Sequence, residues 1–108
     1  MKQVLCERKK LTAVFAMADV IAIGAIRALF DEGLRVPEDI SVAGYDGLRI
    51  GGYFVPKLTT IAQSVDLLAE RSFDLLLSCM QGAQAQHLTV PFRLLTRQSV
   101  RQITEIEG

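Results

Sequence analysis

The feature that most constrains the fold is a repeated pattern of short apolar runs that each end abruptly at a polar residue. Residues 12–17 (TAVFAM) are small and β-favouring, and Asp19 follows them. Residues 40–45 (ISVAGY) form a near-continuous apolar run that ends at Asp46. Runs of this kind are typical of parallel strands buried on both faces. Because only a few residues connect each run to the next element, the pattern predicts an α/β layered domain with parallel strands.

The segment after the first run has the periodicity of a helix. It is expected to start at Val20 with Asp19 as its N-cap, and to end before Gly33, where a left-handed C-cap belongs. Apolar residues occupy two of its faces, namely Ile23, Ile26 and Phe30 on one and Ala22, Ala25 and Leu29 on the other. A helix that covers a sheet is usually polar on its far side. The second apolar face therefore predicts another buried contact, with either a second subunit or a larger domain.

The second half of the chain repeats the strand and helix pattern. Residues 58–62 (LTTIA) predict a third strand that ends at Gln63, and Ser64 is a plausible N-cap for the helix that follows. That helix ends at Gly82, and the apolar side of it holds Val65, Leu68, Ser72, Leu75, Leu76 and Cys79. Two short extended runs follow, over residues 87–90 and 92–95.

Length, charge and cysteine content limit the class of protein. The 108 residues fit one compact unit, and half of them are apolar, which is enough for a core. Twelve acidic and twelve basic residues leave no formal net charge, so no basic excess indicates DNA binding in this segment. Cys6 and Cys79 lie far apart without paired spacing, which favours reduced thiols over a disulfide framework or a zinc site.

The chain carries no pattern that predicts export or a membrane span. The apolar stretch over residues 11–30 is long enough to imitate a span, but it contains Asp19, Arg27 and a helix start midway. The amino terminus, MKQVLCERKK, lacks the apolar core of a signal peptide. The expected location is therefore the cytoplasm, with no membrane partner.

Candidate functional residues follow the ends of the predicted strands. Ala18-Asp19, Asp46 and Gln63 each lie just past the carboxyl end of a strand, and ligands bind at this edge of open parallel sheets. Each residue also has an ordinary explanation as a helix cap, a turn residue or a polar surface residue. The sequence has no nucleophile elbow, phosphate loop or metal-binding cluster, and His87 has no evident partner for acid–base chemistry. We therefore expect neither an enzyme nor a cofactor.

The longer motifs resemble the effector core of the lactose-repressor/galactose-repressor (LacI/GalR) family of bacterial transcription regulators. The resemblance runs from about Leu11 to Val100 and rests on DVIAIGA at residues 19–25, on GLRVPEDISVAGYD, and on LTTIAQ. It implies a periplasmic-binding-protein-like fold with a partial parallel sheet flanked by helices, and a small, sugar-like effector in a cleft between two subdomains. It also implies a DNA-binding headpiece outside this chain, so residues 1–108 would be the C-terminal portion of an effector-binding and dimerisation domain.

The same resemblance implies roles for single residues at the effector site. Asp46 matches the acidic residue that hydrogen-bonds effector hydroxyls, Gln63 a polar residue at the crossover between subdomains, and Val65 an apolar wall nearby. Ala18 stands where many relatives have Asn and cannot donate or accept a side-chain hydrogen bond, so the pocket is expected to be atypical. Gly47 replaces a second acidic residue. The effector-binding candidates are Ala18, Asp19, Asp46, Gln63 and Val65.

The resemblance further implies a homodimer. It assigns Ile23, Arg27, Tyr53 and Phe54 to a two-fold interface, in agreement with the helix that has two apolar faces. The family core is much longer than this chain, and the helix from Val65 packs on the missing part in relatives. We therefore expect a dimer or exchanged elements to cover the stripe formed by Leu68, Leu75 and Leu76.

Three other functions are compatible with the sequence. The chain could belong to an exported sugar-binding protein of the same fold, which an upstream signal peptide would favour. It could belong to a doubly wound α/β enzyme that uses Asp46 as a base. Against this, the sequence has no nucleophile, metal cluster or phosphate loop that would act together with Asp46. It could also be a dimerisation fragment that binds no ligand, and such a fragment would show no thermal stabilisation by ligands.

Overall fold

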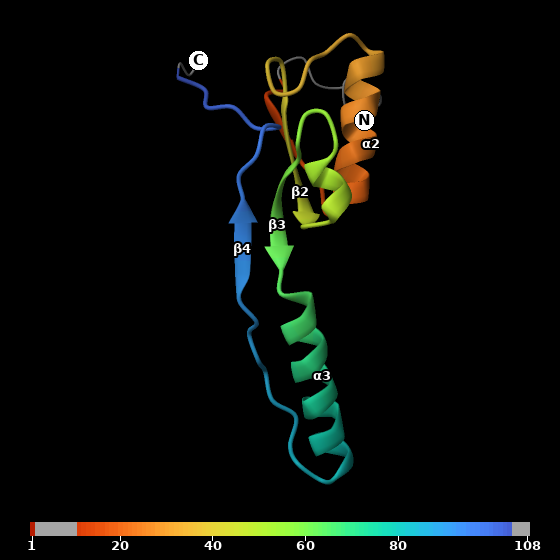
Figure 1. Cartoon of the computed structure of the whole chain (residues 1–108), viewed down its shortest axis with the longest axis vertical. Coiled ribbons are helices and arrows are strands. Elements are labelled where there is room, and N and C mark those ends of the chain that lie inside the picture. Colours follow the sequence, from red (N-terminus) through yellow and green to blue (C-terminus); the bar gives the residue numbers. More distant parts are fainter. Residues whose placement is uncertain (2–10, 105–108) are drawn as a thin grey trace.

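The computed structural model describes residues 1 and 11–104, which form a small sheet with one helix packed on it and a second helix that extends beyond it (Figure 1). The elements in chain order are β1 (Ala13–Phe15), α2 (Asp19–Asp31), β2 (Ser41–Asp46), the 3-10 helix η1 (Arg49–Gly52), β3 (Thr59–Gln63), α3 (Val65–Met80) and β4 (Phe92–Leu95). The three predicted strand–turn units are therefore present. Their boundaries differ from the predicted ones by one or two residues.

The four strands lie in the order β1-β2-β3-β4. β1 and β3 both pair with β2 in parallel, as the buried apolar runs predict, whereas β4 pairs with β3 antiparallel. The α/β fold class is confirmed, and the sheet is mixed. The second extended run, residues 92–95, forms β4, but the prediction of a strand at residues 87–90 is wrong because those residues make no ladder.

The core lies between α2 and the sheet. Ala22, Ile26 and Leu29 of α2 are buried against Val42 and Leu58 of the strand segments. Each fully buried Leu or Val side chain contributes roughly 1.5–3 kcal/mol by removing its surface from water. The buried stripe thus follows the i, i+4, i+7 positions of the helix, and it takes one residue or more from each of the two predicted faces.

The predicted face of Ala22, Ala25 and Leu29 is largely buried, whereas another apolar side of α2 remains exposed. Val20, Ile21 and Phe30 are more than half exposed, at 63%, 56% and 70%. The prediction that the helix is apolar on more than one side is therefore confirmed. Gly33, with φ of 76°, follows the helix in the left-handed conformation that the sequence predicts.

The start of α2 differs from the prediction. The N-cap is Ala18, in an extended conformation and with no side-chain hydrogen bond, and Asp19 is the first residue of the helix. The prediction that Asp19 caps this helix is wrong. Its side chain turns inward to partners on other elements, and it is fully buried.

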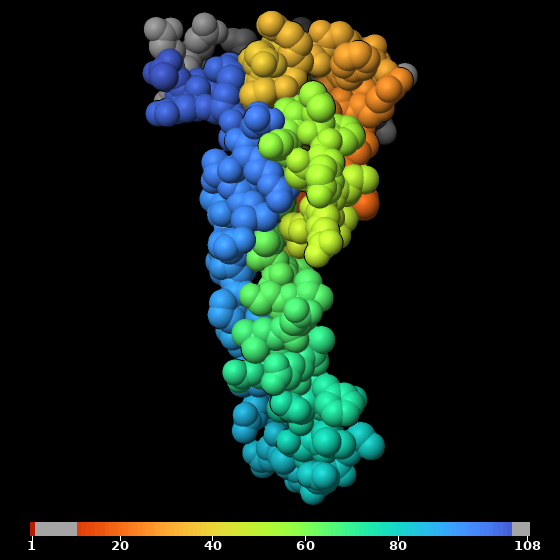
Figure 2. Space-filling model, in the orientation of Figure 1, coloured from red at the N-terminus to blue at the C-terminus, as the bar shows by residue number. Residues whose placement is uncertain are grey.

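Helix α3 extends away from the sheet and buries none of its residues (Figure 1). The chain is accordingly elongated, measuring 56 × 28 × 26 Å, and Figure 2 shows α3 with the following segment as a narrow projection. Leu68 and Leu76 are 41% and 61% exposed. Coverage of this stripe by a second copy or by exchanged elements stays a prediction, because the structure holds one chain.

The segment after β4 closes the amino-terminal end of the sheet. The Ser99 hydroxyl donates to the Val42 carbonyl and accepts from the Thr59 N–H, at 2.5 and 2.8 Å, and Ser99 is fully buried. The Val42 N–H donates to the Ser99 carbonyl at 2.9 Å. This segment lacks any periodicity, so the sequence offered no indication that it joins β2 to β3.

Candidate functional site

The carboxyl ends of β2 and β3 bring Asp46 and Gln63 together. The register pairs Asp46 with Ala62, the neighbour of Gln63, and the Gln63 Nε2 donates to Asp46 Oδ1 at 3.5 Å. Both side chains are partly exposed. The prediction that these two residues share one edge of the sheet is confirmed, and had they lain at opposite ends, no common ligand could have reached both.

The other two candidates with exposed or half-buried side chains, Ala18 and Val65, each lie at the start of a helix. Ala18 is half-buried at the start of α2 and presents only a methyl group, so it adds no hydrogen-bonding capacity to the edge. Val65 is the first residue of α3, directly after Ser64, and is 63% exposed. Their contact with an effector stays a prediction.

Asp19 differs from the other candidates because its hydrogen bonds are made inside the chain. Its Oδ1 accepts from the Thr60 hydroxyl at 2.6 Å, and its Oδ2 accepts from the Leu48 N–H at 2.7 Å. A Cβ at position 44 would overlap Oδ1, so only glycine leaves room for this carboxylate next to β2. Both Asp19 oxygens thus already accept hydrogen bonds from the chain. The contact between Asp19 and an effector stays a prediction, and these distances do not support it.

The turn that follows β2 has a constrained backbone. Asp46 has φ of 139° and Gly47 has φ of 76°. A Cβ on Gly47 would lie 2.6 Å from the Ala62 Cα, so a second acidic side chain could not replace Gly47 without moving β3. Gly47 donates its N–H to the Thr60 hydroxyl oxygen at 3.2 Å. The packing of this turn against β3 therefore requires glycine at position 47, where the resemblance leads one to expect a second acidic residue.

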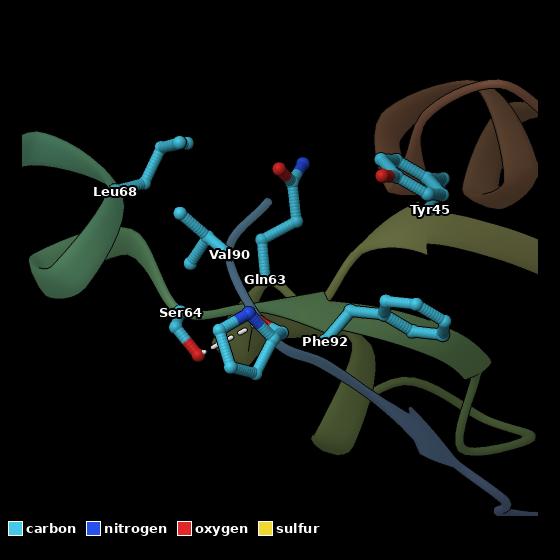
Figure 3. Close-up of a pocket in the computed structure, with 7 residues that line it drawn as sticks. Tyr45, Gln63, Ser64, Leu68, Val90 and Phe92 are labelled. Carbon is cyan, nitrogen blue, oxygen red and sulfur yellow. Dashed lines mark hydrogen bonds between the residues drawn. The ribbon is translucent and has the colours of Figure 1, made fainter. Parts of the chain in front are cut away.

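A shallow hollow of about 70 Å³ lies on the Gln63 side of this edge (Figure 3), which is well below the roughly 300 Å³ of an enclosed small-ligand pocket. It is lined by Tyr45, Gln63, Ser64, Leu68, Val90, Pro91 and Phe92. Tyr45 and Phe92 are aromatic residues that the sequence analysis did not select. Residues two apart on a strand point to the same face, and Phe92 pairs with Gln63. This alternation places Tyr45 and Phe92 on the same face of the sheet as Gln63.

The predicted dimer residues divide into two kinds. Arg27 and Tyr53 are exposed, and Tyr53 is 84% accessible. Ile23 and Phe54 are half-buried and pack partly against the core. Arg27 also forms an ion pair with Asp31 at 3.2 Å. The predicted interface thus combines exposed side chains with side chains that are already partly buried against the core. The interface itself stays a prediction.

Other classes of site find no support among residues 1 and 11–104. In that part of the chain no cluster of three or more His, Cys, Asp or Glu side chains could hold a metal ion. No helix there is long and apolar enough to cross a bilayer. Cys79 is a free, half-buried thiol and His87 is exposed, whereas Cys6 lies outside the described residues.

Comparisons with known proteins agree with this geometry. A family model described as a periplasmic binding protein-like domain matches residues 1–100. The chain is 45% identical over 102 residues to the HTH-type transcriptional repressor PurR of Escherichia fergusonii, covering 93% of this chain and 30% of that protein. The chain therefore spans less than a third of the length of that curated relative.

Two solved structures extend the likeness to the fold. The LacI family transcriptional regulator from Enterococcus faecalis, solved with bound ribose, is 34% identical with a TM-score of 0.83, over 95% of this chain and 39% of that one. A dimeric Lac repressor with a C-terminal deletion is 40% identical with a TM-score of 0.80, over 91% of this chain and 36% of that one. These relatives are transcription regulators and repressors, and none of them is described as an enzyme.

Proposed function

Because this chain belongs to the family of periplasmic-binding-protein-like domains, in the form found in LacI/GalR-type transcription regulators, we propose that it is part of the effector-sensing and dimerisation module of such a regulator. Residues 1–108 would form the C-terminal portion of that module. The effector is a small, sugar-like molecule, and no bond is made or broken. DNA is contacted only by a headpiece outside this chain, and the regulator acts in the cytoplasm.

The observation that carries the proposal is the meeting of Asp46 and Gln63 at one sheet edge, 3.5 Å apart. A carboxylate accepts hydrogen bonds and a primary amide both donates and accepts, so the pair matches the hydroxyl groups of a sugar. Their mutual contact is long and partly exposed, and ligand hydroxyls can replace it at small cost. Tyr45 and Phe92 supply apolar surface beside Gln63.

Allosteric response would arise from closure of two subdomains over this edge. A ligand shifts the equilibrium only by the difference between its affinities for the closed and open forms. The exposed face of α3 and the hollow beside it are the surfaces that closure would bury, and Val65 would form the apolar wall. The dimer face with Ile23, Arg27, Tyr53 and Phe54 would pass the change to the paired headpieces.

The test is sugar binding by the native full-length protein. Ribose is bound in the regulator from Enterococcus faecalis, so D-ribose is the first probe, and a panel of pentoses and hexoses follows in isothermal titration calorimetry. Asp46→Asn and Gln63→Ala are each expected to weaken binding of the responding sugar by about ten-fold or more, since each removes a hydrogen bond to the ligand. Asp74→Asn, on the polar side of α3, is the matched control with unchanged affinity.

Two results would contradict the proposal. One is that no sugar in the panel binds the native protein, which would favour a dimerisation fragment without a ligand. The other is that a sugar binds with the same affinity to Asp46→Asn as to the unaltered protein, which would place the ligand elsewhere. Electrophoretic mobility shifts of operator DNA with and without the sugar then distinguish a regulator from a transport protein of the same fold.

A further inference from the structure

Asp19 is a buried carboxylate, and the proposed function does not explain why it is there. It is fully buried at the first residue of α2, beside Gly44 of β2 and Thr60 of β3. Burying a carboxylate is costly unless hydrogen-bond donors surround it. Asp19 has two such donors, from parts of the chain 29 and 41 residues away. A side chain so placed joins the start of α2 to β3 and to the turn that follows β2.

Both donors lead to the turn that carries Asp46. The Leu48 N–H donates directly to Asp19 at 2.7 Å. The Thr60 hydroxyl donates to Asp19 at 2.6 Å and accepts from the Gly47 N–H at 3.2 Å. The two backbone amides that follow Asp46 are therefore both held, one by the carboxylate itself and one through a single hydroxyl.

The held turn has a backbone that needs such support. Asp46 has φ of 139°, a conformation that side-chain-bearing residues adopt only when their surroundings determine it, at a cost of about 1–3 kcal/mol. The orientation of the Asp46 carboxylate follows from this backbone. Loss of either hydrogen bond lets the backbone return to an ordinary conformation, and the carboxylate then turns away from Gln63.

We propose that Asp19 is the positioning residue of the ligand edge, holding the turn at Gly47 and Leu48 so that the Asp46 carboxylate faces Gln63. This inference rests on the proposed function in that Asp46 is the ligand contact. Asp19 itself touches no ligand and acts through its neighbours. Because it begins α2, the same carboxylate ties the ligand edge to the helix that carries Ile23 and Arg27.

The experiment uses the native full-length protein and four altered forms, with Asp46→Ala as a reference for the Gln63 resonances. Asp19→Ala removes the acceptor of the Leu48 N–H, and Thr60→Val removes the hydroxyl that accepts from the Gly47 N–H. Thr60→Ser keeps that hydroxyl and is the conservative rescue. Leu29→Ala is the stability control, because it removes a fully buried side chain on the same helix without touching the turn.

The first readout is independent of any ligand. Amide hydrogen exchange measured by NMR is expected to be faster at Leu48 in Asp19→Ala, and at Gly47 in Thr60→Val, by about ten-fold or more relative to Leu29→Ala. The Gln63 side-chain amide resonances are expected to move toward those of Asp46→Ala. Thr60→Ser retains the unaltered values. If Asp19→Ala fails to fold, Thr60→Val alone decides the question.

The second readout is affinity for D-ribose, or for the sugar to which the native protein responds. Asp19→Ala and Thr60→Val are expected to bind about ten-fold more weakly, whereas Leu29→Ala and Thr60→Ser bind normally. Unchanged exchange at Leu48 and Gly47, or faster exchange with unmoved Gln63 resonances, would overturn the inference. Absence of sugar binding in the unaltered protein would instead contradict the proposed function, while the exchange data still decide the role of Asp19.

Discussion

Replacing Ser99 with Ala tests how much the segment after β4 contributes to stability. The hydroxyl donates to the Val42 carbonyl and accepts from the Thr59 N–H, and all of Ser99 is buried. Ser99→Ala leaves both backbone groups without this partner, in a site that water does not reach. Each buried group left unsatisfied costs about 1–3 kcal/mol, and a carbonyl costs less than an N–H. We expect a loss of about 2–4 kcal/mol in the free energy of unfolding.

Urea unfolding of the native protein, followed by circular dichroism, measures this loss. With a slope of about 1–3 kcal/mol per molar urea, the midpoint is expected to fall by on the order of 1 M while the slope stays constant. Ser78→Ala, on the exposed surface of α3, is the matched control and should change stability by less than about 0.5 kcal/mol. A midpoint for Ser99→Ala equal to that of the control would refute the assignment of Ser99 as a stabilising bridge from the Val42 carbonyl to the Thr59 N–H.

Two further predictions concern packing and charge. Gly44→Ala adds a Cβ that overlaps Asp19 Oδ1, so it is expected to destabilise the protein by about 1–3 kcal/mol in urea unfolding; Gly24→Ala has open space and should be neutral or stabilising. A hydrogen bond from Arg35 lowers the pKa of Asp39 below its ordinary value of 3.8. Asp39 therefore stabilises the fold above that value and loses the effect as pH falls through its lowered pKa, and unfolding curves of Asp39→Asn should lack this acid-range component.

The strands and helices were predictable because their patterns are local. Apolar runs and helical periodicity fall within a dozen residues, and Gly33 and Gly82, both at positive φ, end α2 and α3 as expected. The meeting of Asp46 and Gln63 was also predictable, since parallel strands present their carboxyl ends at one edge. Both inferences need only the order of elements along the chain.

The inward direction of Asp19 could not be read from the same patterns. A polar residue before a helical run most often caps the helix, and the sequence around Asp19 fits that expectation. Its partners, Leu48 and Thr60, are distant in sequence, and the room for its carboxylate depends on Gly44 in a neighbouring strand. Ser99 is a similar case, because its buried role depends on Val42 and Thr59.

The two ends of the sheet therefore differ in how much hydrogen-bonding capacity they leave for a ligand. At the amino end, Ser99 satisfies the backbone of β2 and β3 with bonds of 2.5–2.9 Å inside the core. At the carboxyl end, Asp46 and Gln63 share one contact of 3.5 Å at a partly exposed position. Only the second arrangement can exchange its hydrogen bonds for those of a small molecule without leaving a buried group unpaired. The edge at which we propose that the effector binds is thus the one where Asp19 holds the backbone and the Asp46 and Gln63 side chains remain available.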